Sequence, residues 1–201
     1  MKNLFLLFSI VFSVGCSQDK QMLNEETEWQ KELNAEYKDA SKSPLKKKDI
    51  KKFKGLDFFK FDSTYVVRAN LKRTPDSKWF NMKTTTDRVT KERIFGIITF
   101  ELKDVKYQLN VYQGKELMQT EEYRDYLFLP FLDDTNGNES YGGGRYIDLR
   151  IPENDSLTID FNTAYNPYCA YNEKYSCPIV PRENYIATEV KAGVKVFKKK
   201  S

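Results

Sequence analysis

Apolar and polar residues alternate along most of the chain after residue 56, and this two-residue period limits the fold more than any other feature of the sequence. The segment 105–111 reads VKYQLNV, with an apolar residue at every second position. Successive side chains of a strand point to opposite faces, so such a segment predicts a strand with one buried face. Comparable segments lie at 65–71, 80–82, 94–102, 126–132, 147–151, 157–161, 186–190 and 194–197.

About seven to nine short strands separated by turn residues predict a mainly β fold, either an antiparallel sandwich or a partly closed barrel. Pro130 interrupts the segment 126–132. Because a proline cannot donate a hydrogen bond to a strand ladder, we expect an edge strand or a bulge at this point. Helical segments precede the strands, which places the fold at the margin of the α+β class.

Residues 25–54 carry the helical pattern. Trp29, Leu33 and Tyr37 recur every four residues among charged neighbours, which predicts an amphipathic helix over 25–38. Ser43 followed by Pro44 is a typical helix start and Gly55 a typical helix end, so we expect a second short helix between them. The sequence therefore predicts one domain over 25–201, with a helical segment 25–54 and a β domain 56–198.

The first sixteen residues have the pattern of an export signal. Lys2 precedes an apolar run over 4–14, and the run ends in Ser13-Val14-Gly15-Cys16. A basic start, a short apolar run and small residues before a cleavage point are typical of a secretory signal peptide. Cys16 resembles the cysteine of the bacterial lipoprotein box. In such lipoproteins this cysteine is acylated and becomes the N-terminus of the mature chain. We predict a signal peptide at 1–15, a lipid on Cys16, a tether over 16–24, and anchoring to the inner or outer membrane of a bacterial cell envelope.

The chain contains no histidine. This excludes Ser-His-Asp and Cys-His catalysis, histidine-ligated zinc and a histidine general base. Any catalysis would depend on carboxylates, Tyr, Lys, Arg or Cys, and we expect neither a cofactor nor a metal site. The net charge of +4 is modest. Without a motif that reads nucleic acid, we expect no nucleic acid partner for an exported protein.

Cys169 and Cys177 remain once Cys16 carries a lipid. In an oxidising compartment such a pair predicts a disulfide, and two free buried thiols are the alternative. Two cysteines without a histidine are too few to hold zinc.

A glycine-rich segment at 131–146 is the first candidate for a ligand site. Gly142, Gly143 and Gly144 precede Arg145 and Tyr146. Their N–H groups are suited to an anion-binding nest, and the arginine fork is suited to a carboxylate or phosphate. The alternative is a wide turn in which Arg145 is paired with Asp133 or Glu139 and has a structural role. The oxygen-rich residues of the same loop suggest calcium, but their spacing does not fit an EF-hand, so no metal is predicted.

The segment 160–178 is the second candidate. It leaves a predicted strand and enters a loop rich in Tyr, Asn and Pro, in which Asn162, Tyr165 and Asn166 could bind a polar ligand. The alternative is that the tyrosines cover one end of the barrel while the asparagine side chains cap turns.

Together these segments resemble a bacterial family known as domain of unknown function 1684. The resemblance covers about residues 29–195, and it implies no reaction because the family has no assigned one. Val194 departs from the pattern, where a glutamate is expected. The matching residues include Ser43, Pro44, Leu45, Phe53, Lys54, Gly55, Leu56, Tyr65, Phe131, Asp133, Thr135, Gly137, Glu139, the run 141–146, Asp148, the runs 160–162, 164–167 and 169–171, Cys177, Pro178, Pro181, Glu183, Asn184, Ala192 and Gly193.

These observations favour an envelope lipoprotein that acts as a binding or assembly module. Its expected ligand is a small anionic or carbohydrate-like molecule, its expected macromolecular partner is an envelope protein, and its contact with the membrane is the lipid on Cys16. The alternative is a hydrolase or transferase that acts on envelope glycan with a pair of carboxyl groups. The carboxylates available for that chemistry in the two segments are Asp133, Glu139 and Asp160.

Overall fold

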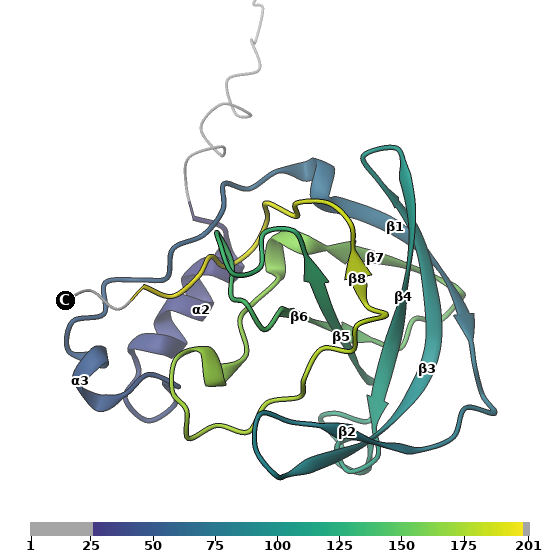
Figure 1. The fold of residues 1–201 in the computed structure, drawn as a ribbon, viewed down its shortest axis with the longest axis horizontal. Coiled ribbons are helices and arrows are strands. Elements are labelled where there is room, and N and C mark those ends of the chain that lie inside the picture. Colours follow the sequence, from purple (N-terminus) through teal and green to yellow (C-terminus); the bar gives the residue numbers. More distant parts are fainter. Residues whose placement is uncertain (1–25, 199–201) are drawn as a thin grey trace, which may run out of the picture.

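The computed structural model describes residues 26–198, in which two helices precede a curled β-sheet (Figure 1). The predicted signal peptide, the predicted lipid site at Cys16 and the predicted tether lie outside the described residues. The helices are α2 (Glu28–Lys38) and α3 (Lys47–Ile50). The strands are β1 (Val66–Arg73), β2 (Phe80–Lys83), β3 (Val89–Leu102), β4 (Val105–Gly114), β5 (Tyr126–Asp133), β6 (Arg145–Arg150), β7 (Ser156–Asp160) and β8 (Tyr185–Ile186).

The strands form one sheet in the order β6-β5-β4-β3-β1-β7, with antiparallel neighbours throughout. Strand β2 pairs with β3, and the short β8 runs parallel to β5. The sheet curls into a half-barrel, so the prediction of a mainly β, largely antiparallel fold with a helical N-terminal part is confirmed. No helix in the described part of the chain has the length and apolar character needed to cross a membrane.

The two faces of the sheet carry two different apolar clusters. Along β4 to β6, Val111, Leu127 and Ile147 point into the main core, and the intervening Tyr112, Phe128 and Tyr146 belong to a second cluster on the opposite face. The alternation follows from the strand geometry. The second cluster matters for function because the loop that follows β7 packs against it and leaves cavities there.

Helix α2 closes one end of the fold. Thr27 and Gln30 form a capping box at its start, in agreement with the predicted helix at 25–38. Tyr37 is completely buried, and its ring meets that of Tyr171 edge-on, with 5.0 Å between the ring centroids. The helix therefore holds the loop at 163–178 against the sheet.

The second helix is shorter than predicted. Helix α3 has four residues and begins after Lys46, whereas Ser43 was the expected cap. The Ser43 hydroxyl instead accepts the N–H of Leu45 within a turn, at 3.2 Å. Leu45 is buried against Tyr37, so its packing holds the chain in an extended path ahead of the helix.

The proline prediction and the last two predicted strands also need correction. Strand β5 contains Pro130 and yet lies between β4 and β6, so it is not an edge strand. The ladder between β4 and β5 is nearly absent, and the Asn184 side chain fills the gap. Its amide donates to the carbonyls of Asn110 and Pro130 at 2.8 and 2.7 Å, and its oxygen accepts the Asn110 N–H at 2.9 Å.

Only the first residue of the predicted strand 186–190 lies in a strand, and the predicted strand 194–197 is a strap that crosses the loops. Its N–H groups bond to scattered carbonyls: Val194 to Ala164 and Lys195 to Asp57, each at 2.8 Å. The apolar alternation is nevertheless explained by packing, because Val190, Ala192 and Val194 are buried while Lys191 is exposed.

Candidate functional site

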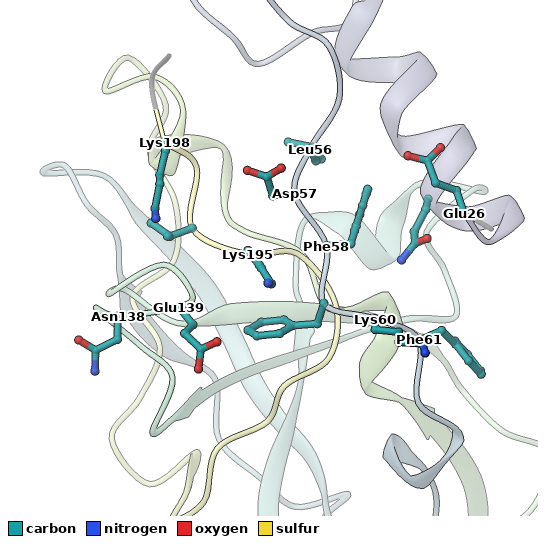
Figure 2. A pocket seen from close by; sticks show the side chains of 13 residues that line it. Glu26, Leu56, Asp57, Phe58, Lys60, Phe61, Asn138, Glu139, Lys195 and Lys198 are labelled. Carbon is teal, nitrogen blue, oxygen red and sulfur yellow. The ribbon is translucent and has the colours of Figure 1, made fainter. Parts of the chain in front are cut away.

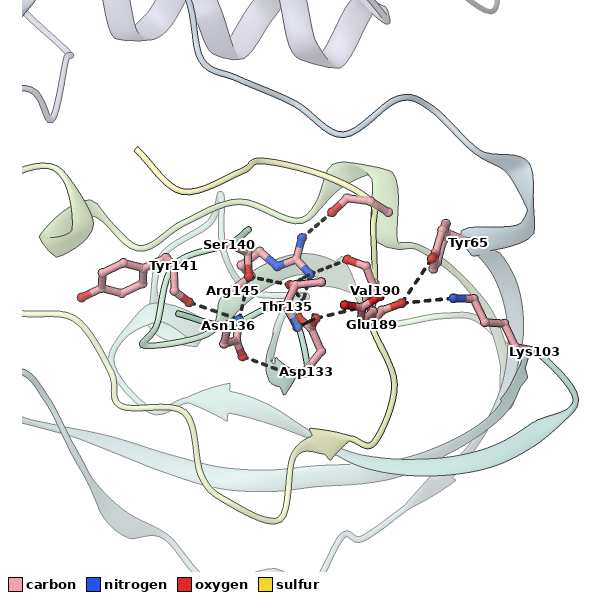
Figure 3. A network of polar contacts seen from close by, with 11 residues as sticks. Tyr65, Lys103, Asp133, Thr135, Asn136, Ser140, Tyr141, Arg145, Glu189 and Val190 are labelled. Atoms are coloured by element: carbon pink, nitrogen blue, oxygen red, sulfur yellow. Dashed lines mark hydrogen bonds and ion pairs between the residues drawn. The ribbon is translucent and has the colours of Figure 1, made fainter. Parts of the chain in front are cut away.

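Arg145, the cation of the first predicted site, is completely buried and is bound to other parts of the chain (Figure 3). Its Nη2 donates to Asp133 Oδ2 at 2.7 Å and to the Val190 carbonyl at 2.8 Å, and its Nη1 donates to the Ala192 carbonyl. The rings of Phe59 and Phe131 pack against the guanidinium, at 5.7 and 5.2 Å. No face of the guanidinium is open to a ligand, so the structural role weighed above for Arg145 is the one that this geometry supports.

Asp133 is the hub of this buried network. Its Oδ1 accepts the N–H and hydroxyl of Thr135, at 2.9 and 2.6 Å, and the N–H of Val190 at 3.2 Å. Both oxygens of this carboxylate therefore accept hydrogen bonds from within the protein. The network joins the end of β5, the glycine-rich turn and the segment 190–192, which explains why charged residues lie inside the fold.

The glycines before Arg145 form a tight turn that leads into β6. Gly142 and Gly143 are exposed, and Gly144 is buried with a φ of +88°. A Cβ at Gly144 would lie 2.7 Å from the Phe131 carbonyl oxygen, so only glycine fits. The turn thus carries Arg145 into the core.

Two of the three predicted loop residues cap the backbone. Asn162 donates to the Asp62 carbonyl at 3.0 Å and accepts the Asp62 N–H at 3.1 Å. Asn166 is buried and donates to the Lys195 carbonyl at 2.8 Å. Their amides hold the loop to the N-terminal segment and to the strap, as the capping interpretation proposed. Tyr165 has a different place, in the cleft described below.

The carboxylates considered for catalysis are held by separate partners. Asp160 accepts the N–H of Asn162 at 2.9 Å and caps a short turn. Glu139 pairs with Lys191 at 3.0 Å, on the wall of a cavity of about 630 Å³ (Figure 2). In the same cavity the Lys195 ammonium lies 4.9 Å from the centre of the Phe59 ring. With Asp133 buried on Arg145, the three carboxylates do not act on one cavity.

The two thiols are free, so the predicted disulfide is absent, and of the two free buried thiols weighed as the alternative Cys177 alone is buried. Cys169 is half-buried, and its N–H donates to the sulfur of the buried Cys177 at 3.2 Å. A hydrogen bond with the Cys177 side chain lowers the pKa of Cys169 to about 6. The same contact raises the pKa of Cys177.

A cleft of about 590 Å³ between α2, β6 and the loop at 163–178 is the candidate site. We call it the Asp148 cleft. Its polar centre is the exposed carboxylate of Asp148, whose Oδ1 accepts two tyrosine hydroxyls, Tyr126 at 2.7 Å and Tyr165 at 2.6 Å. Its lining residues are Trp29, Leu33, Glu36, Tyr37, Tyr146, Asp148, Thr163, Tyr165, Tyr168, Ser176, Cys177 and Pro178.

Electrostatics keep these tyrosines neutral. Burial raises the pKa of both Tyr126 and Tyr165 above the ordinary range, and the Asp148 charge adds to the effect. Both hydroxyls bind Asp148 Oδ1, and Oδ2 of this exposed carboxylate accepts no hydrogen bond from the described part of the chain, so Oδ2 is free to accept one from a ligand. On the opposite wall the Tyr168 hydroxyl donates to Glu36 of α2 at 3.0 Å.

Tyr146 and Tyr165 are the predicted site residues that this cleft brings together. Tyr146 packs edge-on against Tyr165, with 5.9 Å between ring centroids, and donates its hydroxyl to the Pro178 carbonyl. The sequence predicted no ligand-site role for Asp148, Tyr126 or Trp29. Asp148 lies within the pattern shared with the family, and that was the one signal that could have identified it.

Comparison with known proteins gives a family but no activity. Residues 51–195 match the family model described as a protein of unknown function, DUF1684. Among solved structures, the chain is similar to the solution NMR structure of an uncharacterised protein of Haloarcula marismortui. The two share 30% identity with a TM-score of 0.65, covering 83% of this chain and 89% of that one. A comparison with curated proteins found no match.

Proposed function

Because the chain belongs to the DUF1684 family, whose function is unknown, the site must carry the argument, and we propose that this protein is a binding module for a carbohydrate-like ligand. The ligand binds in the Asp148 cleft. The observation that supports this most is the Asp148 carboxylate, which is oriented by Tyr126 and Tyr165 and keeps one oxygen free for a ligand hydroxyl.

The walls of the cleft suit a sugar ring. Trp29 and Tyr168 supply aromatic surface for the apolar C–H face of a sugar, and the carboxylates of Asp148 and Glu36 accept from its hydroxyl groups. A carboxylate bound by neutral donors forms strong, charge-assisted hydrogen bonds. Mostly apolar walls with a few fixed polar groups are the usual composition of a small-molecule site.

Of the two ligand classes expected from the sequence, the carbohydrate-like one fits better. The anionic ligand depended on Arg145, and that guanidinium is bound within the core. The charged side chains that line the Asp148 cleft are the carboxylates of Glu36 and Asp148, which would repel an anion. The cleft therefore favours an uncharged polyhydroxylated molecule.

We also propose that the protein works at the cell envelope, held by a lipid on Cys16 behind a cleaved signal peptide. Five lysines near α3 are exposed and form no ion pair in the described part of the chain, so they are free to contact anionic lipid headgroups. Replacing Cys16 with Ser should move the protein from the membrane fraction to the soluble fraction, and retention in the membrane would contradict the anchor. The five are Lys47, Lys48, Lys51, Lys52 and Lys54.

Glycan-array screening followed by calorimetric titration of the best glycan tests the binding proposal. Asp148→Asn keeps the shape of the side chain and removes its charge, so we expect affinity to fall about tenfold, as for one charge-assisted hydrogen bond. Asp76→Asn is the matched control, because Asp76 is exposed and outside the cleft. A protein that binds no glycan, or an unchanged affinity in Asp148→Asn, contradicts the proposal.

A further inference from the structure

Another cavity, of about 550 Å³, lies on the other side of Tyr146 and Tyr165 from the Asp148 cleft. We call it the Glu92 pocket. The two cavities share only Tyr146, Tyr165 and Pro178, which separate them. The other lining residues are Arg88, Thr90, Lys91, Glu92, Gly114, Lys115, Glu116, Leu117, Thr120, Tyr126 and Phe128. The proposed sugar site does not use this pocket, so it needs its own explanation.

Two polar side chains of β3, Glu92 and Thr90, meet in this pocket, and neither has a cation beside it. Glu92 is only 6% exposed and forms no ion pair in the described part of the chain. The Thr90 hydroxyl is close enough to interact with the Glu92 carboxylate, and its buried oxygen has no further partner within hydrogen-bond geometry. Buried polar atoms without partners are uncommon in folded proteins and are expected where a ligand supplies the missing bonds.

The local backbone makes room for this carboxylate. Glu92 lies opposite Gly114 in the ladder between β3 and β4. A Cβ at Gly114 would lie 3.3 Å from both Glu92 carboxylate oxygens, closer than most contacts of that kind. The glycine therefore lets the carboxylate lie over the strand at the pocket wall.

The charges around Glu92 point to a cation as its partner. Burial raises the pKa of Glu92 to about 7, and the nearby Glu116 adds to this. The cations lining the pocket lie toward its rim: Lys91 and Lys115 are exposed, and Arg88 donates to the Ser176 carbonyl at 2.7 Å. The tyrosines that line the pocket, Tyr126, Tyr146 and Tyr165, are neutral because burial raises the pKa of each. A positive group next to Glu92 would thus meet negative charge.

We propose that the Glu92 pocket binds an organic ammonium group with an apolar body. An ammonium carries donors only, so it satisfies both the Glu92 carboxylate and the Thr90 hydroxyl oxygen. The rings of Tyr126, Phe128 and Tyr146 offer aromatic faces to the cation, and Leu117 offers apolar surface to its body. An anionic ligand would bring like charge to Glu92, and a purely apolar one would leave the buried carboxylate without a counter-charge.

Calorimetric titration of the full chain with phenethylamine and 1-hexylamine tests the proposal, and 2-phenylethanol and 1-hexanol are the uncharged controls. At pH 8 we expect the amines to bind and the alcohols to bind at least tenfold more weakly. Because binding needs the ionised carboxylate, lowering the pH to 6 should weaken the amines about tenfold, which is the change in ionised fraction for a pKa near 7.

Two variants separate this site from the sugar site. Glu92→Gln should lose at least tenfold in amine affinity while keeping its glycan affinity, and Asp148→Asn should show the reverse. Three results would each overturn the proposal: neither amine binds at millimolar concentration, amines and alcohols bind equally well, or Glu92→Gln leaves the amine affinity unchanged. None of these results depends on whether the Asp148 cleft binds a sugar.

Discussion

Removal of the Arg145 side-chain charge should nearly unfold the protein. Arg145→Met keeps an unbranched side chain but leaves the buried Asp133 carboxylate without its cation, a loss that costs about 3–5 kcal/mol. The carbonyls of Val190 and Ala192 also lose their donor, at about 1 kcal/mol each. The sum of about 5–7 kcal/mol approaches the whole stability of a typical domain, about 5–15 kcal/mol.

Urea denaturation followed by the fluorescence of Trp29 and Trp79 measures this change in the free energy of unfolding. The matched variant Asp133→Asn should lose less, about 3 kcal/mol, because its remaining oxygen still accepts from Thr135. In the double variant the losses should not add, since each change removes the same ion pair. A loss below about 1 kcal/mol for Arg145→Met would refute the structural role and return Arg145 to the list of ligand-binding residues.

Three further predictions concern pH, the backbone and thiol reactivity. The pKa of Glu92 is raised to about 7 in the folded state, so its ionisation penalises folding increasingly from about pH 4.5 to 7. Glu92→Gln should therefore stabilise the protein by up to about 3 kcal/mol at pH 8 and by little at pH 4.5. Equal shifts of the melting temperature at both pH values would contradict this. Gly193 and Gly137 both have a positive φ, of +77° and +85°, but a Cβ at Gly193 would lie 2.3 Å from a backbone oxygen, whereas a Cβ at Gly137 would meet open space. In urea denaturation, Gly193→Ala should therefore lower the free energy of unfolding by about 1–3 kcal/mol more than Gly137→Ala. Equal losses in the two variants would contradict the clash. Iodoacetamide at pH 7 should alkylate Cys169 before Cys177, with a half-maximal rate near pH 6; equal labelling by peptide mass spectrometry would contradict the lowered pKa.

The sequence predicted the elements whose pattern is local. The alternation over 105–111 and the spacing of Trp29, Leu33 and Tyr37 correspond to β4 and α2, because each arises from one buried face of one element. The segment 194–197 shows the limit of this reasoning. Val194 and Phe197 pack on the cluster around Tyr37, but the N–H groups of the segment bond to loops, and apolar residues that pack in this way do not distinguish a strand from such a strap.

The candidate site was harder to predict because its parts come from distant segments. Asp148 of β6 meets Tyr126 of β5 and Tyr165 of a later loop, and the opposite wall is Glu36 of α2. No single-sequence pattern places these residues together. Arg145 was identified as important from its glycine-rich context, but only the packing showed that its guanidinium lies inside the fold.

Tyrosine NMR signals test the central claim, that the Asp148 cleft is the ligand site and the Arg145 network is scaffold. In protein labelled with ¹³C on its tyrosine rings, titration with the best-binding glycan should shift the signals of Tyr165 and Tyr168, which line the cleft. The signal of Tyr65, which is buried near the Arg145 network and donates to the Glu189 carbonyl, should stay in place. Shifts at Tyr65 with unchanged signals from Tyr165 and Tyr168 would contradict the account.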